Sequence, residues 1–412
     1  MRRVAITGMS VLSSTGMGLE PFWENIKAGK HGFGPITGFD TTDFDIKLAA
    51  EIKGFDPADW GIGKKEARRL DLFCQYSTVA SRLAIEDAGD FATGLDPYKI
   101  GVLVGSGIGG FRSIEEEHTK FLERGGSKLS VFFIPMMITN MAGGRVAIDH
   151  GFMGENYCPV SACATSAHAI GEAFRKIKHG SMDACVAGGT EAAISKFSLS
   201  GFNVMGALTK GTDPDRLSIP FDKERAGFVM GDGASILVLE EMEHAKKRGA
   251  HIYAEIVGYG ATDDAYHITS PRPDGEGAAK AMEFAMAEGG LNPADIDYIN
   301  AHGTSTEIND KYETQAIKLA LGDHAKAVAI SSTKSMTGHL LGAAGAIEAV
   351  ICAKSLEEGV IPATIGYQVA DEECDLDYVT EGLRHQNIKA VLSNSLGFGG
   401  HNASLAFVKY EG

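Results

Sequence analysis

The stretch CPVSACATSAHAIGEAFRKIKHG, residues 158–180, joins a strand-like run to a helix through a turn of small residues. Apolar side chains recur after the turn at helical spacing and predict one buried helix face (Ala167, Ile170, Phe174 and Ile177). Three basic residues fall in the last turn, where positive charge complements the helix dipole. This unit places Cys163 at the amino end of the helix.

The same alternation of short β-branched runs and longer helical runs continues along the chain, which predicts an α/β fold with helix-covered sheets. We expect strands at 2–8, 99–105, 156–161, 182–188, 233–241, 252–259, 296–301, 327–331, 389–396 and 402–409. We expect helices at 64–88, 109–122, 136–147, 164–178, 274–289, 307–320 and 338–356.

The length of 412 residues suggests two domains or one duplicated fold. No linker of biased composition divides the chain, and we place the boundary near residue 250, giving halves 1–250 and 251–412. The order strand, Gly-rich turn, strand, small-residue helix occurs in both halves, an echo that favours duplication.

Composition excludes several classes of function. The formal net charge of −16 argues against general nucleic-acid binding, which depends on Lys and Arg contacts to phosphate. The six cysteines form no CxxC pair, so we expect reduced thiols and no structural zinc. The sequence has no signal peptide and no apolar run long enough to span a membrane, and we expect a soluble cytoplasmic protein.

The segment GSGIGG, residues 105–110, matches the G-x-G-x-x-G pattern of dinucleotide sites between a strand and a helix. That pattern also requires an acidic residue at the end of the next strand, but LSVFFIP ends without a carboxylate. We therefore interpret the segment as a tight turn with a close backbone approach.

Position alone leaves two interpretations of Cys163. Free cysteine is a common core residue, and that interpretation suits Cys74, Cys185 and Cys352, which lie in apolar runs. At a helix amino end, however, unpaired N–H groups favour a thiolate, which should lower the pKa of Cys163 and make it a nucleophile. The same N–H groups can hold a developing oxyanion.

Two histidines follow strand-like runs in Gly-flanked turns, His302 in NAHGTST and His339 in STKSMTGH. Each is either a structural histidine or part of a ligand crevice, since strand ends line such crevices in α/β sheets. Glu348 is the only ionisable residue in its apolar helix apart from His339, and Lys334 is the nearest cation that could pair with it. Together with Cys163, these residues suggest acyl chemistry.

The segment KKEARR, residues 64–69, carries four positive charges on this acidic chain. A solvated helix face is the plain interpretation of this cluster (Lys64, Lys65, Arg68 and Arg69), and a functional role for it stays open at this point.

Four motifs taken in order resemble an elongating condensing enzyme of the 3-oxoacyl-[acyl-carrier-protein] synthase II type: SACATSAHA, NAHGTSTEIND, STKSMTGHLLGAAGAIE and NSLGFGGHN. The likeness extends over almost the whole chain. It implies a thiolase-like fold, in which two similar α/β halves form a five-layered α-β-α-β-α core in a homodimer.

The resemblance also implies a reaction in which acyl and malonyl groups arrive on acyl carrier protein and no cofactor is required. Cys163 would accept the acyl chain, with its own N–H and that of Phe398 as oxyanion hole. His302 and His339, supported by Lys334 and Glu348, would hold the malonyl thioester oxygen while CO2 leaves.

Further positions take binding roles by resemblance. Substrate contacts are implied at Phe398, Thr304, Thr306, Ile108, Phe202 and Gly399, and the basic cluster would dock the acidic carrier protein. Some relatives hold a structural cation at positions matching Asn300, Glu348, Ser393 and Asn394. Two departures, the SACATSAHA variant and His401 in GFGGHN, flank the acyl site.

Alternatives remain within the same fold. A non-catalytic partner subunit would lack the nucleophile, and a coenzyme A thiolase would need a second cysteine in place of SNSLGFGGHN. An initiating synthase pairs cysteine and histidine with asparagine instead of His339. A polyketide-type ketosynthase has the same motifs and stays open.

Overall fold

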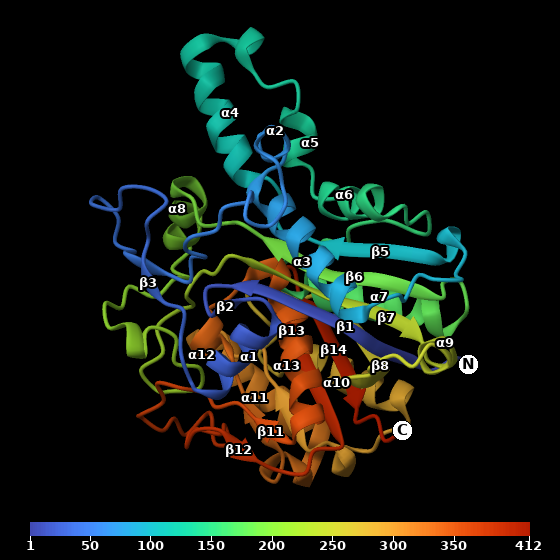
Figure 1. Ribbon diagram of the computed structural model, residues 1–412. Coiled ribbons are helices and arrows are strands. Elements are labelled where there is room, and N and C mark those ends of the chain that lie inside the picture. The colour runs from blue at the N-terminus through green and yellow to red at the C-terminus, as the bar shows by residue number, and fades with distance from the viewer.

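The computed structural model describes residues 1–412, and a ten-stranded mixed sheet runs through its centre (Figure 1). Nine strands follow one another in hydrogen-bonded order: β10 (Ala329–Ser331), β9 (Tyr298–Asn300), β13 (Ala390–Gly397), β14 (His401–Val408), β8 (Ala254–Asp263), β1 (Val4–Ser13), β7 (Gly233–Glu241), β6 (Ala184–Glu191) and β5 (Ile100–Gly105). The tenth, β2 (Gly16–Met17), pairs with β1.

The sheet consists of two halves with the same pairing pattern. In the first half, β7 pairs antiparallel with β1, β6 pairs antiparallel with β7, and β5 pairs parallel with β6. In the second half, β14 pairs antiparallel with β8, β13 pairs antiparallel with β14, and β9 pairs parallel with β13. The halves meet at β1 and β8 over only three residue pairs, Val4–Ile6 with Ala254–Ile256.

Three layers of helices alternate with the two half-sheets. Helices α7 (Thr165–Lys178) and α13 (Ala344–Glu358) contact strands of both halves and form the central layer. Helices α3 (Leu72–Ala88) and α6 (Met141–His150) cover the outer face of the N-terminal half-sheet, and α10 (Glu276–Gly289) and α11 (Glu307–Leu321) that of the C-terminal half-sheet. The predicted five-layered α/β fold is confirmed.

Strand residues alternate between the two faces, as a pleated sheet requires. In β5, Leu103 packs into the central core, whereas Val102 and Val104 pack against the outer helices. In β13, Val391 faces the central core and Leu392 the outer one. Both half-sheets are therefore buried on both faces, which explains why their sequences are almost continuously apolar.

The remaining elements lie outside these layers or at their ends. The helices are α1 (Leu19–Lys27), α2 (Lys64–Ala67), α4 (Phe111–Arg124), α5 (Phe133–Met137), α8 (Lys196–Val204), α9 (Met242–Lys247) and α12 (Lys334–Thr337). The strands are β3 (Gly34–Pro35), β4 (Leu48–Ala49), β11 (Val360–Ile361) and β12 (Arg384–His385). Helices α2, α4 and α5 project together from the body (Figure 1). None of the helices is both long and apolar enough to cross a bilayer.

Several predicted elements were wrong in extent. The helix expected at 338–356 begins at Ala344, so His339 precedes it, and the helix expected at 136–147 begins at Met141. The strand expected at 156–161 is reduced to one parallel bridge between Asn156 and Val102, because Pro159 has no N–H to donate to a ladder. The helix expected at 64–88 breaks after α2, because Asp71 accepts a hydrogen bond from the Phe73 N–H and caps a new helix.

Candidate active site

A strained turn presents Cys163 at the amino end of α7, as the sequence predicted. Ala162 has a φ of 50°, a left-handed conformation that is unfavourable for a residue with a Cβ atom. The Thr165 hydroxyl holds the turn by accepting a hydrogen bond from the Ser161 N–H at 2.9 Å. The thiol is buried but borders a cavity of about 380 Å³.

The expectation that the pKa of Cys163 falls was wrong. Burial raises the pKa of this thiol to about 12, and the nearby charge of Lys334 and a hydrogen bond from the Phe398 N–H oppose burial only in part. The resting site therefore contains a neutral thiol, whose proton has to leave when the sulfur is acylated.

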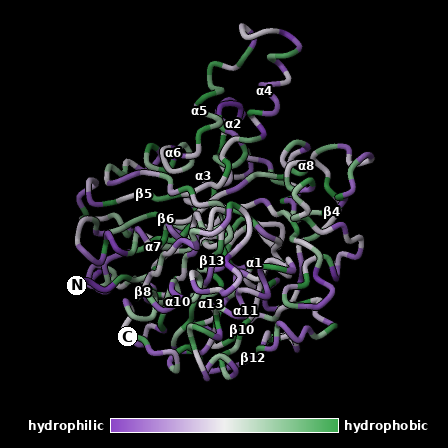
Figure 2. Tube along the Cα trace, turned by 180° about the vertical axis from the view of Figure 1, so that it is seen from behind, coloured by the Kyte–Doolittle hydropathy of each residue, from purple (hydrophilic) through white to green (hydrophobic).

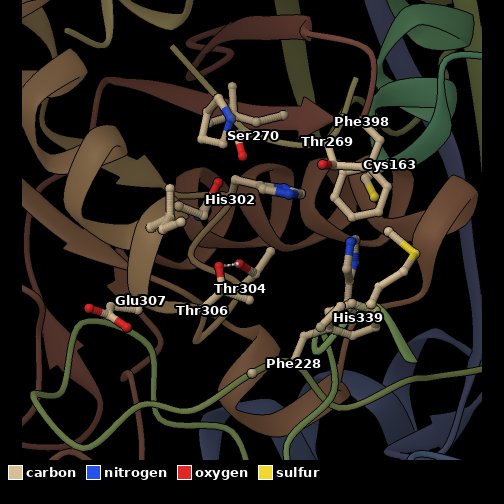
Figure 3. Close-up of a pocket in the computed structure, with 18 of the residues that line it drawn as sticks. Cys163, Phe228, Thr269, Ser270, His302, Thr304, Thr306, Glu307, His339 and Phe398 are labelled. Carbon is tan, nitrogen blue, oxygen red and sulfur yellow. Dashed lines mark hydrogen bonds between the residues drawn. The ribbon is translucent and has the colours of Figure 1, made fainter. Parts of the chain in front are cut away.

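His302 and His339 face the thiol and lie next to each other (Figure 3). Their ring centroids are 5.2 Å apart at an angle of 85°, and side-chain ligand atoms of Cys163 and both histidines lie within 4.8 Å of one another. Burial and the charge of Lys334 lower the pKa of both imidazoles well below the ordinary value. Both rings are therefore neutral near pH 7 and can donate an N–H to a substrate oxygen.

Backbone hydrogen bonds fix both histidines. The His339 N–H donates to the Val229 carbonyl at 2.7 Å, and the His339 carbonyl accepts from the Gly231 N–H at 2.9 Å. The His302 N–H donates at 2.8 Å to the buried carboxylate of Glu313, a site residue that the sequence analysis missed. Its position on the helix after NAHGTST was the available signal.

Lys334 and Glu348 form the predicted ion pair, and both are buried. The Lys334 ammonium also donates to the main-chain carbonyl of His302 at 2.6 Å. Burial raises the pKa of Glu348 to about 7 against the attraction of Lys334. The Lys334 ammonium thus places a positive charge close to both imidazoles.

Most residues predicted to bind substrate line the cavity, namely Phe202, Thr304, Thr306 and Phe398. The hydroxyls of Thr304 and Thr306 are 2.9 Å apart and are joined by the dashed line in Figure 3. Ile108 does not line the cavity but packs in the apolar cluster that contains Cys163. Gly399 also lies outside the lining, and its N–H donates to the Ile268 carbonyl.

His401 and the residues of the SACATSAHA variant other than Cys163 lie outside the cavity lining. The Nδ1 atom of His401 is 3.6 Å from the Asp263 carboxylate. His168 in the SACATSAHA variant hydrogen-bonds to the Tyr259 hydroxyl.

The Phe398 N–H reaches the thiol because β13 lies directly against the nucleophile turn. A Cβ atom on Gly397 would stand 2.7 Å from the Ser161 carbonyl oxygen and 3.2 Å from the Cys163 nitrogen. Only glycine permits this approach. The Phe398 N–H, which follows Gly397, therefore lies beside the Cys163 sulfur.

The backbone N–H groups of the GSGIGG segment bind a buried carboxylate. Glu191 accepts hydrogen bonds from the N–H groups of Gly107 and Ile108, the donors that would otherwise hold a pyrophosphate. This supports the tight-turn interpretation over a nucleotide site. The sequence analysis missed Glu191, whose signal was a carboxylate ending the apolar strand ACVAGGTE.

The basic cluster lies apart from the cavity lining. Lys64, Lys65, Arg68 and Arg69 are exposed on and after α2, which is coloured hydrophilic in Figure 2. The Arg69 guanidinium stacks over the Phe132 ring at 4.7 Å.

The positions matched to a structural cation include two side-chain oxygen atoms that are available to bind it. Asn300 Oδ1 and Glu348 Oε2 are buried without a hydrogen-bond partner, whereas Asn394 Oδ1 already accepts from Ser404 at 2.9 Å. Cys163, His302 and His339 also have metal-like spacing, with ligand atoms within 4.8 Å of one another.

Comparison with known proteins agrees with this geometry. The model of the Beta-ketoacyl synthase, N-terminal domain, matches residues 1–245, and that of the C-terminal domain matches 253–368. The 3-oxoacyl-[acyl-carrier-protein] synthase 2 of Synechocystis sp. is 50% identical over 411 residues, covering 100% of this chain and 99% of the relative.

Two solved structures have the same fold. The ishigamide ketosynthase/chain length factor superposes with a TM-score of 0.93 at 34% identity and 99% coverage of both chains. A type II PKS acyl-carrier protein in complex with its ketosynthase, bound to the hexaketide, gives 0.91 at 33% identity, with 100% of both chains covered.

Proposed function

The chain belongs to the beta-ketoacyl synthase family, and from this premise we propose that it is an acyltransferase of fatty-acid synthesis. It condenses acyl-acyl carrier protein with malonyl-acyl carrier protein to give 3-oxoacyl-carrier protein, CO2 and free carrier protein. The observation that carries the proposal is the convergence of Cys163, His302 and His339 on one cavity.

In the first half-reaction the Cys163 sulfur attacks the acyl thioester carbon. The N–H groups of Cys163 and Phe398 hold the oxyanion, and the thiol proton passes by way of a neutral imidazole to the departing carrier thiolate. The products are an acyl-cysteine and free carrier protein.

In the second half-reaction the N–H groups of His302 and His339 hold the thioester oxygen of malonyl-carrier protein. The bond to the carboxylate breaks, CO2 leaves and the electron pair forms an enolate that the imidazoles stabilise. The enolate carbon attacks the acyl-cysteine carbonyl carbon, the carbon–sulfur bond breaks, and the released Cys163 thiolate takes up a proton from solvent.

A polyketide pathway is the alternative, since the solved ketosynthase of a type II PKS complex shares the fold at 33% identity. The fatty-acid relative at 50% identity favours the first proposal.

The test is intact mass of the wild type and of Cys163→Ala after incubation with acyl-carrier proteins of medium and long chain. We expect one acyl adduct on the wild type and none on the variant, which should still decarboxylate malonyl-carrier protein. Absence of an adduct on the folded wild type would overturn the proposal.

Acyl carrier protein is the proposed partner, docking on the basic cluster and reaching the cavity with its flexible arm. A homodimer is also proposed. Exposed apolar side chains on the projecting segment, including Val131 and Ile134, support it because a second copy would cover them. A monomer at micromolar concentration in sedimentation equilibrium would contradict the dimer. A cytoplasmic location and independence of cofactors remain predictions.

A structural cation is proposed at Asn300 Oδ1 and Glu348 Oε2, where it would neutralise buried oxygen atoms. Thermal unfolding in potassium, sodium and choline chlorides at equal ionic strength tests this proposal. Identical midpoints in all three salts would argue against it.

A further inference from the structure

Glu191 ends β6 with a fully buried carboxylate that accepts hydrogen bonds from four donors. Oε1 accepts from the Ser106 hydroxyl at 2.8 Å and the Ile108 N–H at 3.3 Å. Oε2 accepts from the Gly107 N–H at 2.8 Å and the Gly342 N–H at 2.9 Å. One side chain thus joins a loop of the N-terminal half to the turn that precedes α13.

Both joined segments carry apolar side chains into the cluster that surrounds Cys163. Ile108 comes from the loop, and Leu341, which also lines the cavity, comes from the turn. The loop and the turn are packed too closely for a side chain at position 342. A Cβ atom on Gly342 would stand 2.4 Å from the Gly107 nitrogen and 2.7 Å from Glu191 Oε2. The carboxylate therefore fixes where Ile108 and Leu341 stand relative to the thiol.

The turn bound by Glu191 is the duplicate of the nucleophile turn. Leu341 has a φ of 46° and Ala162 a φ of 50°, and each begins a short 3-10 turn that leads into a central helix. Gly342 thus takes the place that Cys163 takes in the other half. Its N–H is capped by Glu191, so this second turn supports the pocket instead of binding a substrate oxygen.

We propose that Glu191 is a positioning residue that sets the acyl-chain-length selectivity of Cys163 loading by holding Ile108 and Leu341 in place. The inference rests on the proposed function. In Glu191→Gln, an NH2 group replaces one oxygen and faces backbone N–H groups that lose their acceptor. The imidazoles that decarboxylate the malonyl group make no contact with this carboxylate.

The test compares loading rates for medium-chain and long-chain acyl-carrier proteins, followed by intact mass, in wild type, Glu191→Gln and Ser106→Ala. We expect the ratio of the two rates to change by about tenfold in Glu191→Gln and in the same direction in Ser106→Ala. Malonyl-carrier decarboxylation should stay within about twofold of wild type.

Glu240→Gln is the matched control, because Glu240 is as buried as Glu191 but lies far from it along the sheet. Glu191 pairs with Gly233 at one end of β7, and Glu240 lies near the other end. Its chain-length ratio should equal that of wild type. An unchanged ratio in Glu191→Gln and Ser106→Ala would overturn the inference, and if Glu191→Gln fails to fold, the Ser106→Ala ratio alone decides it. A wild type that loads no acyl chain would instead refute the proposed condensing function.

Discussion

The ammonium group of Lys334 donates a buried hydrogen bond of 2.6 Å to the main-chain oxygen of His302. It also pairs with Glu348, and together with burial, which is the larger cause, its charge lowers the pKa of both His302 and His339. Lys334 therefore positions one imidazole and adds to the burial that keeps both rings neutral. A neutral ring can donate to a substrate oxygen and also accept a proton, and the two half-reactions require both.

Substitutions at Lys334 and Glu348 should show that Lys334 has one effect on stability and a separate effect on catalysis. Lys334→Ala leaves the Glu348 carboxylate buried and unpaired, which costs about 3–5 kcal/mol in the free energy of unfolding. Lys334→Ala/Glu348→Gln should recover much of that loss but not the rate of decarboxylation, because the charge behind the imidazoles is missing. Urea unfolding and CO2 release measure the two effects. Decarboxylation at the wild-type rate in the double variant would remove Lys334 from the mechanism.

The cysteine and the two histidines of the site were predictable because each carries a local signature. Cys163 begins an amphipathic helix, while His302 and His339 follow strands in Gly-flanked turns, and their meeting follows from the duplicated fold. The pKa of Cys163 was not predictable. The sequence shows the helix amino end that lowers it, but burial of the turn, which raises it, depends on side chains packed from distant segments.

Glu191 shows a second limit. A single carboxylate at a strand end is common, and its four donors come from residues 106–108 and 342, which are far apart in the sequence. Only the folded chain reveals that it binds them all. The failed strand at 156–161 has a local cause instead, since Pro159 was visible in the sequence.

The rate of malonyl decarboxylation should change little as the pH falls through the ordinary pKa of histidine. Because the pKa of His302 and of His339 is lowered, both rings stay neutral as pH falls through about 6.5, the ordinary histidine value. The unfolded chain binds protons there and the folded chain does not, so these histidines also reduce stability below that pH. CO2 release by Cys163→Ala, measured between about pH 5 and 8, should hold until well below 6.5. A half-loss at 6.5 would mean that the imidazoles titrate normally.

The reactivity of the thiol should rise with pH without a plateau near the ordinary cysteine value. Burial raises the pKa of Cys163 to about 12, so the thiolate fraction keeps growing through the accessible alkaline range. Iodoacetamide modification of Cys163, followed by peptide mass, measures this. A plateau near about pH 8.5 would contradict it.

Gly397→Ala should damage acylation by moving the Phe398 N–H away from the sulfur. The new Cβ atom would lie 2.7 Å from the Ser161 carbonyl, so β13 or the nucleophile turn has to shift. Loss of one oxyanion donor costs about 10²–10³-fold in rate. Gly144→Ala in α6 is the control, since its nearest neighbour would be Met141 at 4.0 Å. Loading at the wild-type rate in folded Gly397→Ala would exclude Phe398 as a donor.

Reversing charge on the basic cluster should weaken carrier-protein binding without touching the chemistry. Lys64, Lys65 and Arg68 are exposed and form no ion pair, so Lys64→Glu/Lys65→Glu/Arg68→Glu changes only the field at this surface. We expect KM for acyl-carrier protein to rise about tenfold or more at low salt, with the difference shrinking as salt screens the charges. Transfer from a small acyl thioester should be unchanged. Lys30→Glu, an exposed lysine outside the cluster, should leave KM as in wild type. If it raised KM equally, the effect would come from net charge and not from docking at α2.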